Sequence, residues 1–460
     1  MSAGRVVIVG GGASGTILAA HILRLPGRPL GVTIVEERPE IGRGVAYGTT
    51  EPGHILNTRA ASMSAFQDDP DHFWKWLLAS GFGLDVRCSD PFCFVPRAVY
   101  AHYLKALLDP WRGTPDDAAP LTIVQGRCVG VRQAGGGVAV ELADGTSLLG
   151  QAAVLATGHD LADYNARGPY VNPWTTPVSS DLAAGDPVLI LGTGLSMIDT
   201  VIELTDRGHR GRITALSRRG LLPRTHRRNV PMRIDAADVP FGTGIAYLLR
   251  WFRRTAEWAA TEGGDWRDVV DGVRPHTARL WQSLSVAERE RFLRHARTWW
   301  EVHRHRMPPE SEERLRAAMA RGRLEILAAR FVGSDPAGDG VRVRFRRRGS
   351  RETETVDVAK VVDCTGILRG PDANRAGIVA SLIEAGTARP DPCRIGIKVD
   401  ESCAVIDGGG KPAARLFAVG PVTRAQFWEI TAVPDIRVQC AALAGTIADR
   451  LGGESGPAHR

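Results

Sequence analysis

The sequence predicts an α/β fold with two separate parallel sheets, on three observations. Residues 5–23 contain an apolar strand, a Gly-x-Gly-x-x-Gly run and an apolar helix. The same order of strand, glycine turn and helix begins again over residues 187–204. Two later apolar strands, at 153–156 and 360–364, both end in Thr-Gly. Because a glycine turn from strand into helix is typical of a Rossmann-like unit, we expect two Rossmann-like dinucleotide-binding domains.

The first glycine turn has the spacing of a dinucleotide site. Gly10 permits the tight turn, Gly12 lets a pyrophosphate approach the backbone, and Gly15 lets helix and strand pack closely. The N–H groups at the start of the helix can then hold phosphate. A second strand ends about twenty residues on in Glu36, whose carboxylate can bond ribose hydroxyls. The turn therefore predicts a bound dinucleotide.

The segment after this unit is expected to be a long functional loop followed by short elements. Residues 42–66 are punctuated by glycine and lack a clear period, and long loops inside compact domains are usually functional. We expect helices at 72–78 and 98–108, strands at 121–124 and 153–156, and a small antiparallel meander from 129–132 and 138–142 with a turn at Asp144 and Gly145.

The second glycine turn predicts an NADPH site. Gly192 and Gly194 keep the spacing, although a methionine replaces the third glycine. The next strand ends in Ser217-Arg218-Arg219 rather than in an acidic residue. An acid would repel a 2′-phosphate, whereas a hydroxyl and two guanidinium groups can bind one. The alternative is a solvated basic loop.

The rest of the chain predicts a helical insertion and a return to the first domain. Residues 235–323 shift to Trp, Arg and helix-forming residues. Strands are expected at 323–328, 341–346, 355–359, 360–366 and 416–420, then a helix over 436–451 with Pro434 and Asp435 at its start. We place the first dinucleotide-binding domain at 1–165 and 361–460, and the second domain, with its insertion, at 166–360.

Composition and charge indicate a globular protein that binds anions. The 460 residues are 43% apolar and 24% charged, and the net charge is +7, with arginine dominating the basic residues. Because arginine suits phosphates and carboxylates, anionic cofactors and an anionic substrate explain the excess; an arginine-rich solvated surface is the alternative. The sequence contains no basic stretch interleaved with aromatic residues, a pattern that would predict nucleic-acid binding.

The sequence also bears on compartment, cysteines and metals. No apolar run is long enough to span a membrane and the first strand begins at Arg5, so we expect no signal peptide and a cytoplasmic protein; a homo-oligomer is compatible with the sequence.

The seven cysteines are expected to be thiols. Cys88 and Cys93 have the spacing of flavin disulfide reductases but lie far downstream, in a Pro-containing loop, so we assign them no redox role. The run at 303–306 lacks a carboxylate or cysteine at ligand spacing, so no metal site is expected.

The two glycine turns, the Thr-Gly strand ends and the C-terminal strand–Gly–helix resemble the flavoproteins with two dinucleotide-binding domains. Motifs at 42–48, 54–57 with 63–66, 192–199, 303–308 and 428–437 are similar to one bacterial FAD/NAD(P)-binding group. Its neighbours are the class B flavin monooxygenases, among them N-hydroxylating enzymes, and one member is regarded as a urate hydroxylase. The resemblance implies FAD in the first domain, NADPH in the second, Thr-Gly turns at the domain crossings, and a last helix that points at the flavin.

Spacing and resemblance together assign the site. The cofactor-binding candidates are Gly10, Gly12, Ser14, Gly15, Glu36, Met63, Thr157, Gly158, Gly192, Gly194, Leu195, Ser196, Ser217, Arg218, Arg219, Thr365, Gly366, Gly420 and Pro434. The resemblance places the loop at 54–66 over the flavin. There, Asn57 is our candidate for a hydrogen bond near flavin N5/C4a, and Arg59 for stabilising a peroxide anion or an acidic substrate. The alternative for both is that they satisfy only the local backbone.

These observations predict an FAD-dependent, NADPH-consuming monooxygenase. It would hydroxylate a small organic metabolite with molecular oxygen through a C4a-(hydro)peroxyflavin, N-hydroxylation being one form of the reaction. Three other interpretations stay open: an NADPH-dependent flavin dehydrogenase or reductase without oxygen insertion, a urate-hydroxylase-like ring hydroxylase, and a non-catalytic NADP-sensing flavoprotein. A disulfide reductase is disfavoured, because Pro421 stands where those enzymes usually place an Asp; we predict that activity survives replacement of Cys88 or Cys93 by Ser.

Overall fold

The structure, a computed structural model, describes residues 4–27, 30–85, 88–112, 120–159, 169–365, 370 and 377–452. The first of its sheets contains, among these residues, six strands in the order β15-β16-β7-β1-β2-β3. They are β1 (Arg5–Val9), β2 (Gly31–Glu36), β3 (Leu121–Gln125), β7 (Ala152–Leu155), β15 (Ala404–Ile406) and β16 (Pro412–Ala418). β1 pairs in parallel with β2 and β7 and is buried along Val6, Val7 and Ile8, as expected for a strand covered on both faces.

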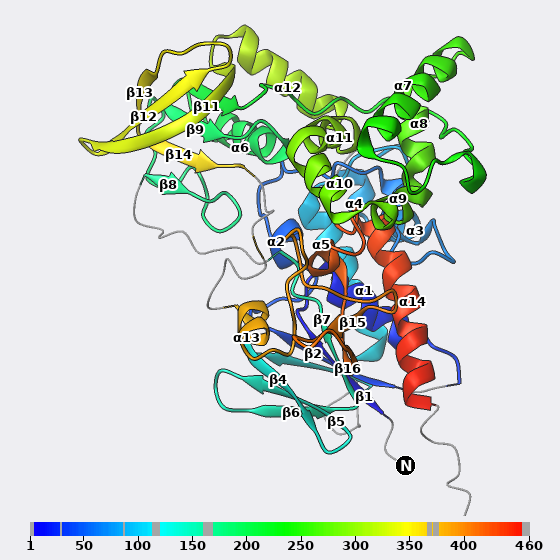
Figure 1. Ribbon diagram of the computed structural model, residues 1–460. Helices are drawn as coiled ribbons and strands as arrows, with labels where there is room; N and C mark the ends of the chain where they lie inside the picture. Colours follow the sequence, from blue (N-terminus) through cyan, green and yellow to red (C-terminus); the bar gives the residue numbers. More distant parts are fainter. Residues whose placement is uncertain are drawn as a thin grey trace, which may run out of the picture.

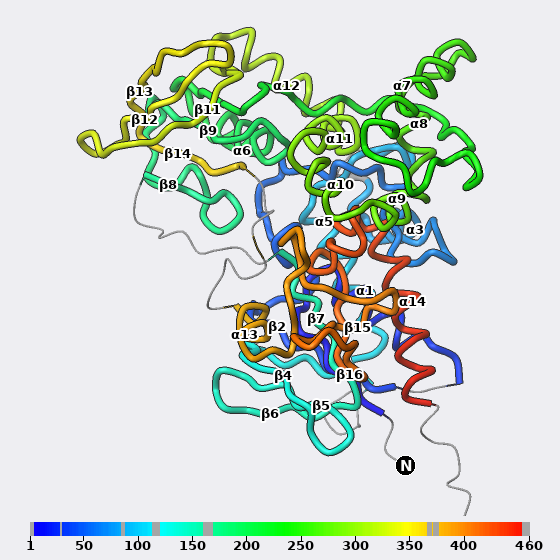
Figure 2. The backbone as a smooth tube through the Cα atoms, viewed as in Figure 1, coloured from blue at the N-terminus to red at the C-terminus, as the bar shows by residue number. Residues whose placement is uncertain are grey.

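Helices from both ends of the chain cover the first sheet. They are α1 (Ala13–Leu23), α2 (Gly44–Tyr47), α3 (His72–Ala79), α4 (Phe82–Asp85), α5 (Arg97–Ala106), α13 (Ile378–Glu384) and α14 (Val433–Gly452), with short 3-10 turns η1 (Ala60–Ser62) and η6 (Gly420–Thr423). Figure 2 shows the start of the chain and its last helix lying together, and the thiol of Cys440 on α14 contacts the Ser14 carbonyl of α1 at 3.6 Å. The C-terminal segment thus returns to the first sheet.

The second sheet has seven strands in the described part of the chain, ordered β13-β12-β11-β10-β9-β14-β8. They are β8 (Tyr170–Val171), β9 (Val188–Leu191), β10 (Ile213–Ser217), β11 (Leu324–Ala337), β12 (Gly340–Arg347), β13 (Glu354–Val358) and β14 (Lys360–Asp363), with α6 (Leu195–Asp206) and α12 (Pro309–Ala320) packed beside them. We expected the first domain to resume at residue 361. β14 pairs with β9 as far as Asp363 and with β8 as far as Val362, so the second sheet continues past that residue.

A third, antiparallel sheet of β4 (Cys128–Ala134), β5 (Gly137–Leu142) and β6 (Ser147–Gly150) confirms the predicted meander. Figure 1 shows it at the lower end of the first-sheet lobe, with the second-sheet lobe at the upper left. Among the described residues, no helix combines the length and the apolar character that a membrane span needs.

The helical insertion lies between β10 and β11. It contains α7 (Ile245–Thr261), α8 (Trp266–Val273), α9 (Thr277–Ser283), α10 (Val286–Arg291), the π-helical turn η5 (Phe292–Ala296) and α11 (Arg297–Arg304). Trp281 stacks on Trp428 at 4.7 Å between ring centroids, and its indole N–H donates to the carbonyl of Ala425 at 2.8 Å. The insertion therefore packs on the C-terminal segment of the first domain, which Figure 1 shows beneath it.

Candidate active site

The first glycine turn leaves no room for a side chain at Gly10 or at Gly15. Gly10 has φ +109°, and a Cβ there would lie 2.4 Å from the Ala156 carbonyl oxygen. A Cβ at Gly15 would lie 1.9 Å from the carbonyl oxygen of Gly10. Gly12 begins α1, and no side chain caps that helix, so its first amide groups are free of a side-chain acceptor. The turn therefore offers backbone donors to a phosphate.

Glu36 stands against this turn at the end of β2. Its carboxylate accepts hydrogen bonds from the amides of Gly11 (2.7 Å) and Arg38 (2.9 Å), which fixes its orientation. The glycine-rich segment after it closes over the turn, because the Gly42 amide donates to the Gly11 carbonyl at 2.7 Å and Gly44 packs against Gly12. This contact of the 42–48 motif with the phosphate turn was not predicted.

Thr157 supports a cofactor in the first domain. Its hydroxyl is buried, and within the described part of the chain it has no hydrogen-bond partner. Gly158, next in the chain, has φ +67° and open space around its Cα. An orphaned hydroxyl beside a glycine cradle fits a bound group that supplies the missing partner.

Two further candidates of the first domain, Ser14 and Gly420, lie against each other at the starts of α1 and η6. A Cβ at Gly420, which has φ +76°, would lie 2.2 Å from the Ser14 hydroxyl. The Gly420 amide, however, already donates to the side chain of Gln439 at 2.8 Å, so we do not assign that amide to a cofactor. Pro434 stands in the first turn of α14. Gly366 lies outside the described residues.

The second glycine turn repeats the first. Gly192 has φ +105°, and a Cβ there would lie 2.3 Å from the Cys364 carbonyl oxygen, as Gly10 does from Ala156. Gly194 begins α6 without a side-chain cap and faces open space. The same backbone geometry thus occurs twice, each time beside a strand that ends in Thr-Gly.

The basic end of β10 lies beside the helical insertion. The Ser217 hydroxyl is 2.9 Å from that of Thr193 and accepts from the Gly220 amide at 3.0 Å. Arg219 donates to the His295 carbonyl at 3.1 Å, and its guanidinium carbon lies 5.6 Å from the ring centroid of Trp299. Arg218 has no hydrogen bond or ion pair to the described residues, which leaves it available to a phosphate.

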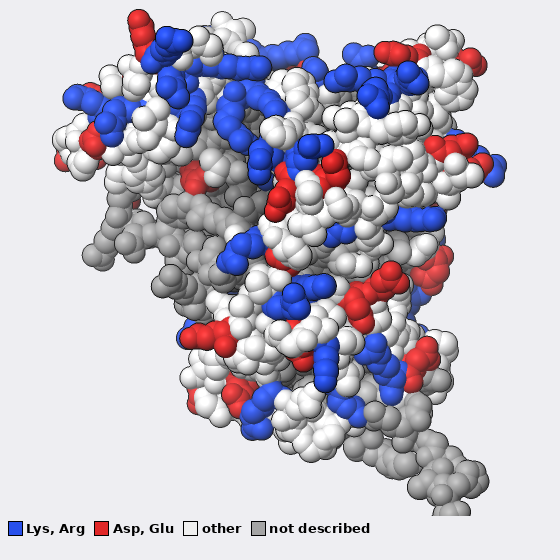
Figure 3. Space-filling model, in the orientation of Figure 1, with Lys and Arg blue, Asp and Glu red and all other residues white. Residues whose placement is uncertain are grey.

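A cavity of about 1360 Å³ lies between the second sheet, the helical insertion and the first domain. The candidates that line it are Asn57, Arg59, Met63, Gly192, Gly194, Leu195, Ser196, Ser217, Arg218, Arg219 and Thr365. Residues 431–433, at the start of α14, also line it. Figure 3 shows Lys and Arg side chains gathered over the upper part of the molecule. The second cradle, the loop after Leu56 and the start of the last helix therefore share one space.

Asn57 and Arg59 lie where two domains meet. The His226 ring, which is mostly buried, lies with Nε2 2.9 Å from the Asn57 carbonyl oxygen, and the Arg59 guanidinium donates to the carbonyl of Arg227. Burial, reinforced by the neighbouring charge of Arg306, lowers the pKa of His226 to about 4. The imidazole is therefore neutral and donates from Nε2.

The insertion and the segment before α14 supply cavity residues that sequence reasoning missed. The buried carboxylate of Glu429 accepts from the Trp300 indole at 2.6 Å and pairs with Arg304 at 3.2 Å. Arg306 is 3% exposed and pairs with Asp271. The motifs at 303–308 and 428–437 were the available signal, but their pairing depends on residues more than a hundred positions apart.

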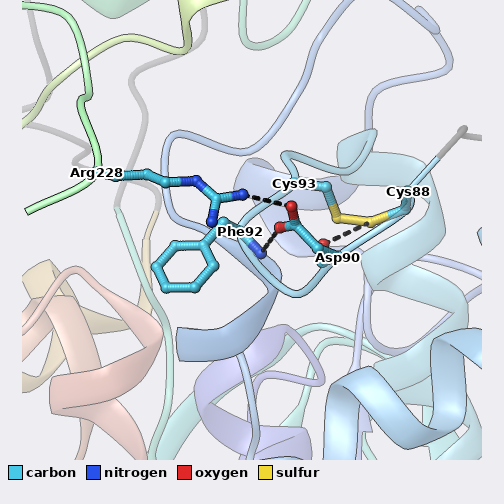
Figure 4. The surroundings of a disulfide bond; sticks show 5 residues. All are labelled: Cys88, Asp90, Phe92, Cys93 and Arg228. Carbon is cyan, nitrogen blue, oxygen red and sulfur yellow. Dashed lines mark hydrogen bonds and ion pairs between the residues drawn. A yellow bond between two sulfur atoms is a disulfide. The ribbon is translucent and has the colours of Figure 1, made fainter.

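The structure corrects the expectation of seven thiols. Cys88 and Cys93 form a disulfide, with their Cα atoms 5.5 Å apart (Figure 4). The reason is local: Asp90 accepts from the amides of Phe92 and Cys93, and this turn brings the two cysteines together. The loop also presents the Phe92 ring to Arg228, whose guanidinium pairs with Asp90.

Residues 7–160 match a family model described as FAD-NAD(P)-binding, and no curated protein matches the chain. The fold is that of a flavoprotein with two dinucleotide-binding domains. Solved structures that share it include the ornithine N-hydroxylase of Kutzneria sp. 744 with reduced FAD, NADP+ and L-ornithine (15% identity, 98% of this chain, 100% of that chain, TM-score 0.64).

Two more solved structures share the fold. One is L-lysine 6-monooxygenase from Pseudomonas syringae (16% identity, 97% of this chain, 100% of that chain, TM-score 0.66). The other is the FAD-bound cadaverine monooxygenase of Erwinia amylovora (13% identity, 100% of this chain, 97% of that chain, TM-score 0.65). At these identities the likeness concerns the fold.

Proposed function

We propose that the protein is an FAD-dependent, NADPH-consuming monooxygenase that hydroxylates a small organic metabolite. One observation carries the proposal: a single cavity joins the second glycine cradle to the loop of Asn57 and to the start of α14. A nicotinamide held at Gly192–Ser196 and a flavin held by the first domain would share that space. The structural neighbours named above are an N-hydroxylase and two monooxygenases, which supports a hydroxylation reaction for this chain.

The residues present fit both cofactors. Around the first turn, Gly10 and Gly15 exclude side chains, α1 offers uncapped amides, and Thr157 has an orphaned hydroxyl. FAD, when bound, accepts a hydride from NADPH and activates molecular oxygen. The protein would orient the rings and enclose the reaction, and residues of the insertion form part of the cavity wall.

In the second domain, Arg218 would bind the 2′-phosphate that distinguishes NADPH from NADH. We expect Arg218→Gln to raise the KM for NADPH by about tenfold to a hundredfold, which corresponds to one lost charge-assisted bond, and to leave the KM for NADH nearly unchanged. Arg210→Gln is the matched control, since Arg210 is exposed on the same domain and does not line the cavity. An equal rise of the KM for NADPH and of the KM for NADH would contradict the assignment of Arg218 to the 2′-phosphate.

The decisive experiment follows NADPH and oxygen together. The purified protein should contain FAD, NADPH should reduce it without air, and with air and a substrate the uptake of oxygen should yield a product one oxygen atom heavier. Substrate oxidation that proceeds equally well without oxygen would indicate a dehydrogenase instead. Failure to bind FAD would exclude the whole proposal.

A further inference from the structure

The acidic side chains of the cavity wall are already neutralised. Among the described residues that line the cavity, the carboxylates are those of Asp199, Asp271, Glu301 and Glu429. Their partners are, in that order, Arg97 (2.6 Å), Arg306, Arg297 (2.7 Å) and Arg304 (3.2 Å). A substrate ammonium group would have to displace an arginine from one of these pairs, and it would meet the remaining guanidinium groups at close range.

The arginines of the wall outnumber its acids, and they divide by position. Eleven arginines line the cavity, against four carboxylates. Arg218, Arg219, Arg330 and Arg348 belong to the second domain, after β10, on β11 and after β12, where a nucleotide phosphate would use them. Arg59 belongs to the first domain, in the loop that precedes Met63.

Arg59 is held in place without a carboxylate of its own. Its guanidinium donates to the carbonyl of Arg227, and its central carbon lies 5.0 Å from the ring centroid of Phe92. The nearby acids serve other cations, since Asp271 pairs with Arg306 and Asp90 with Arg228. No described carboxylate lies within ion-pair distance of Arg59. Burial, as its main cause, lowers the pKa of this guanidinium, as expected where a partly desolvated cation lacks a counter-ion.

Backbone hydrogen bonds hold the segment after Arg59 against the neighbouring disulfide-closed turn. The disulfide-closed turn at 88–93 carries Phe92, and its carbonyl groups at Pro91 and Cys93 accept from the amides of Ala61 (2.8 Å) and Ala60 (3.0 Å). Figure 4 shows Phe92 projecting from this turn beside Arg228. Because backbone hydrogen bonds join this turn to the loop after Arg59, the main chain that carries the guanidinium is held in a fixed position.

We propose that the substrate is an organic acid and that its carboxylate binds Arg59. The inference rests on the proposed function and names its substrate class. Such a substrate differs from cadaverine, the substrate of one structural neighbour, which carries ammonium groups and no carboxylate, whereas ornithine and lysine, the substrates of two others, carry both kinds of group.

The experiment measures ligand binding to the FAD-loaded protein with NADP+ present. Three matched sets share a carbon skeleton and differ in charge: hexanoate, hexanamide and hexylamine; phenylacetate, phenylacetamide and 2-phenylethylamine; heptanedioate, heptanediamide and heptane-1,7-diamine. Binding is read from the flavin absorption spectrum and by calorimetry. We expect at least one acid to bind about tenfold or more tightly than its amide, and every amine to bind more weakly than its acid.

Variants then locate the preference. Arg59→Gln should remove the advantage of the acid over the amide, and Arg59→Lys should retain part of it, because a point charge remains without the fork of donors. Arg227→Gln is the matched control: its side chain is exposed, and the carbonyl that holds Arg59 is unchanged. It should keep the full preference.

Three results would overturn the inference: amines that bind more tightly than acids, acids that bind no better than their amides, or a preference that survives Arg59→Gln. The readout needs no turnover, so any of these leaves the monooxygenase proposal standing. A protein that takes up no FAD contradicts both.

Discussion

At the scale of a single residue, His226 connects the second domain to the loop of Asn57 in the first domain. Its Nε2–H donates to the Asn57 carbonyl, and its ring lies 5.1 Å from that of Phe94. Burial and the nearby charges of Arg306 and Arg59 lower its pKa to about 4. A protonated imidazole is therefore excluded from this contact at neutral pH.

This shift predicts a pH dependence of stability. The unfolded His titrates near 6.5, so between about pH 6.5 and pH 4 the unfolded chain binds a proton that the folded chain does not, and stability falls as pH falls through that window. The loss is about 2 kcal/mol at pH 5. His226→Gln should lessen the decline in urea midpoint between pH 7.5 and pH 5. An unchanged decline would show that His226 is not the group responsible.

The cysteines give a second prediction at this scale. All seven lie in the described part of the chain, and five are free. Thiol titration in denaturant should therefore count five groups before reduction and seven after it. Seven reactive thiols before reduction would contradict the disulfide. Replacing Cys88 and Cys93 by Ser together should lower stability by about 2 kcal/mol, as expected for a short loop, while NADPH turnover survives.

At the scale of elements, the two strand–turn–helix units follow one steric rule. Gly10 and Gly192 both adopt positive φ and both press against a carbonyl at the end of the neighbouring strand. Sequence reasoning found both turns because this constraint acts within about fifteen residues. It also placed the acid of the first unit and the arginines of the second at the ends of β2 and β10.

Gly15 offers the sharpest test of the first unit. Gly15→Ala should raise the Kd for FAD by about tenfold or more, because the added methyl group would overlap the Gly10 carbonyl and push α1 away from β1. The bound flavin per protein measures this directly. Gly445→Ala is the control: that glycine lies in α14 with nothing near its Cα, so alanine should keep the flavin and stabilise the helix by about 0.5–1 kcal/mol.

At the scale of the whole molecule, two ion pairs, one of them buried, connect the helical insertion to the first domain. Glu429 precedes α14 and pairs with Arg304 of α11, and Asp435 within α14 pairs with Arg274 at 2.8 Å. Burial alone would raise the pKa of Glu429. The charge of Arg304 and the Trp300 hydrogen bond are among the causes that outweigh it, and the pKa is lowered. This carboxylate is therefore ionised in the folded protein.

Glu429→Gln should destabilise the protein by about 3 kcal/mol, because it leaves the Arg304 guanidinium buried without its counter-ion. The shift of the thermal unfolding midpoint measures the loss. Glu354→Gln, which breaks an exposed pair with Arg347, should cost about 1 kcal/mol or less. Equal effects of the two substitutions would show that burial does not strengthen the dependence on Glu429.

The sequence by itself determined the two glycine cradles, the class of fold, the position of the helical insertion and the acidic and basic strand ends. Each of these follows from backbone sterics or from apolar periodicity within one short segment. Only the tertiary structure decided which arginines have counter-ions, that Cys88 and Cys93 are paired, and that β14 stays in the second sheet to Asp363. Ion pairing and strand pairing depend on proximity in space. Arg59, His226, Arg306 and Glu429 meet around one cavity only because packing of the insertion brings distant segments together.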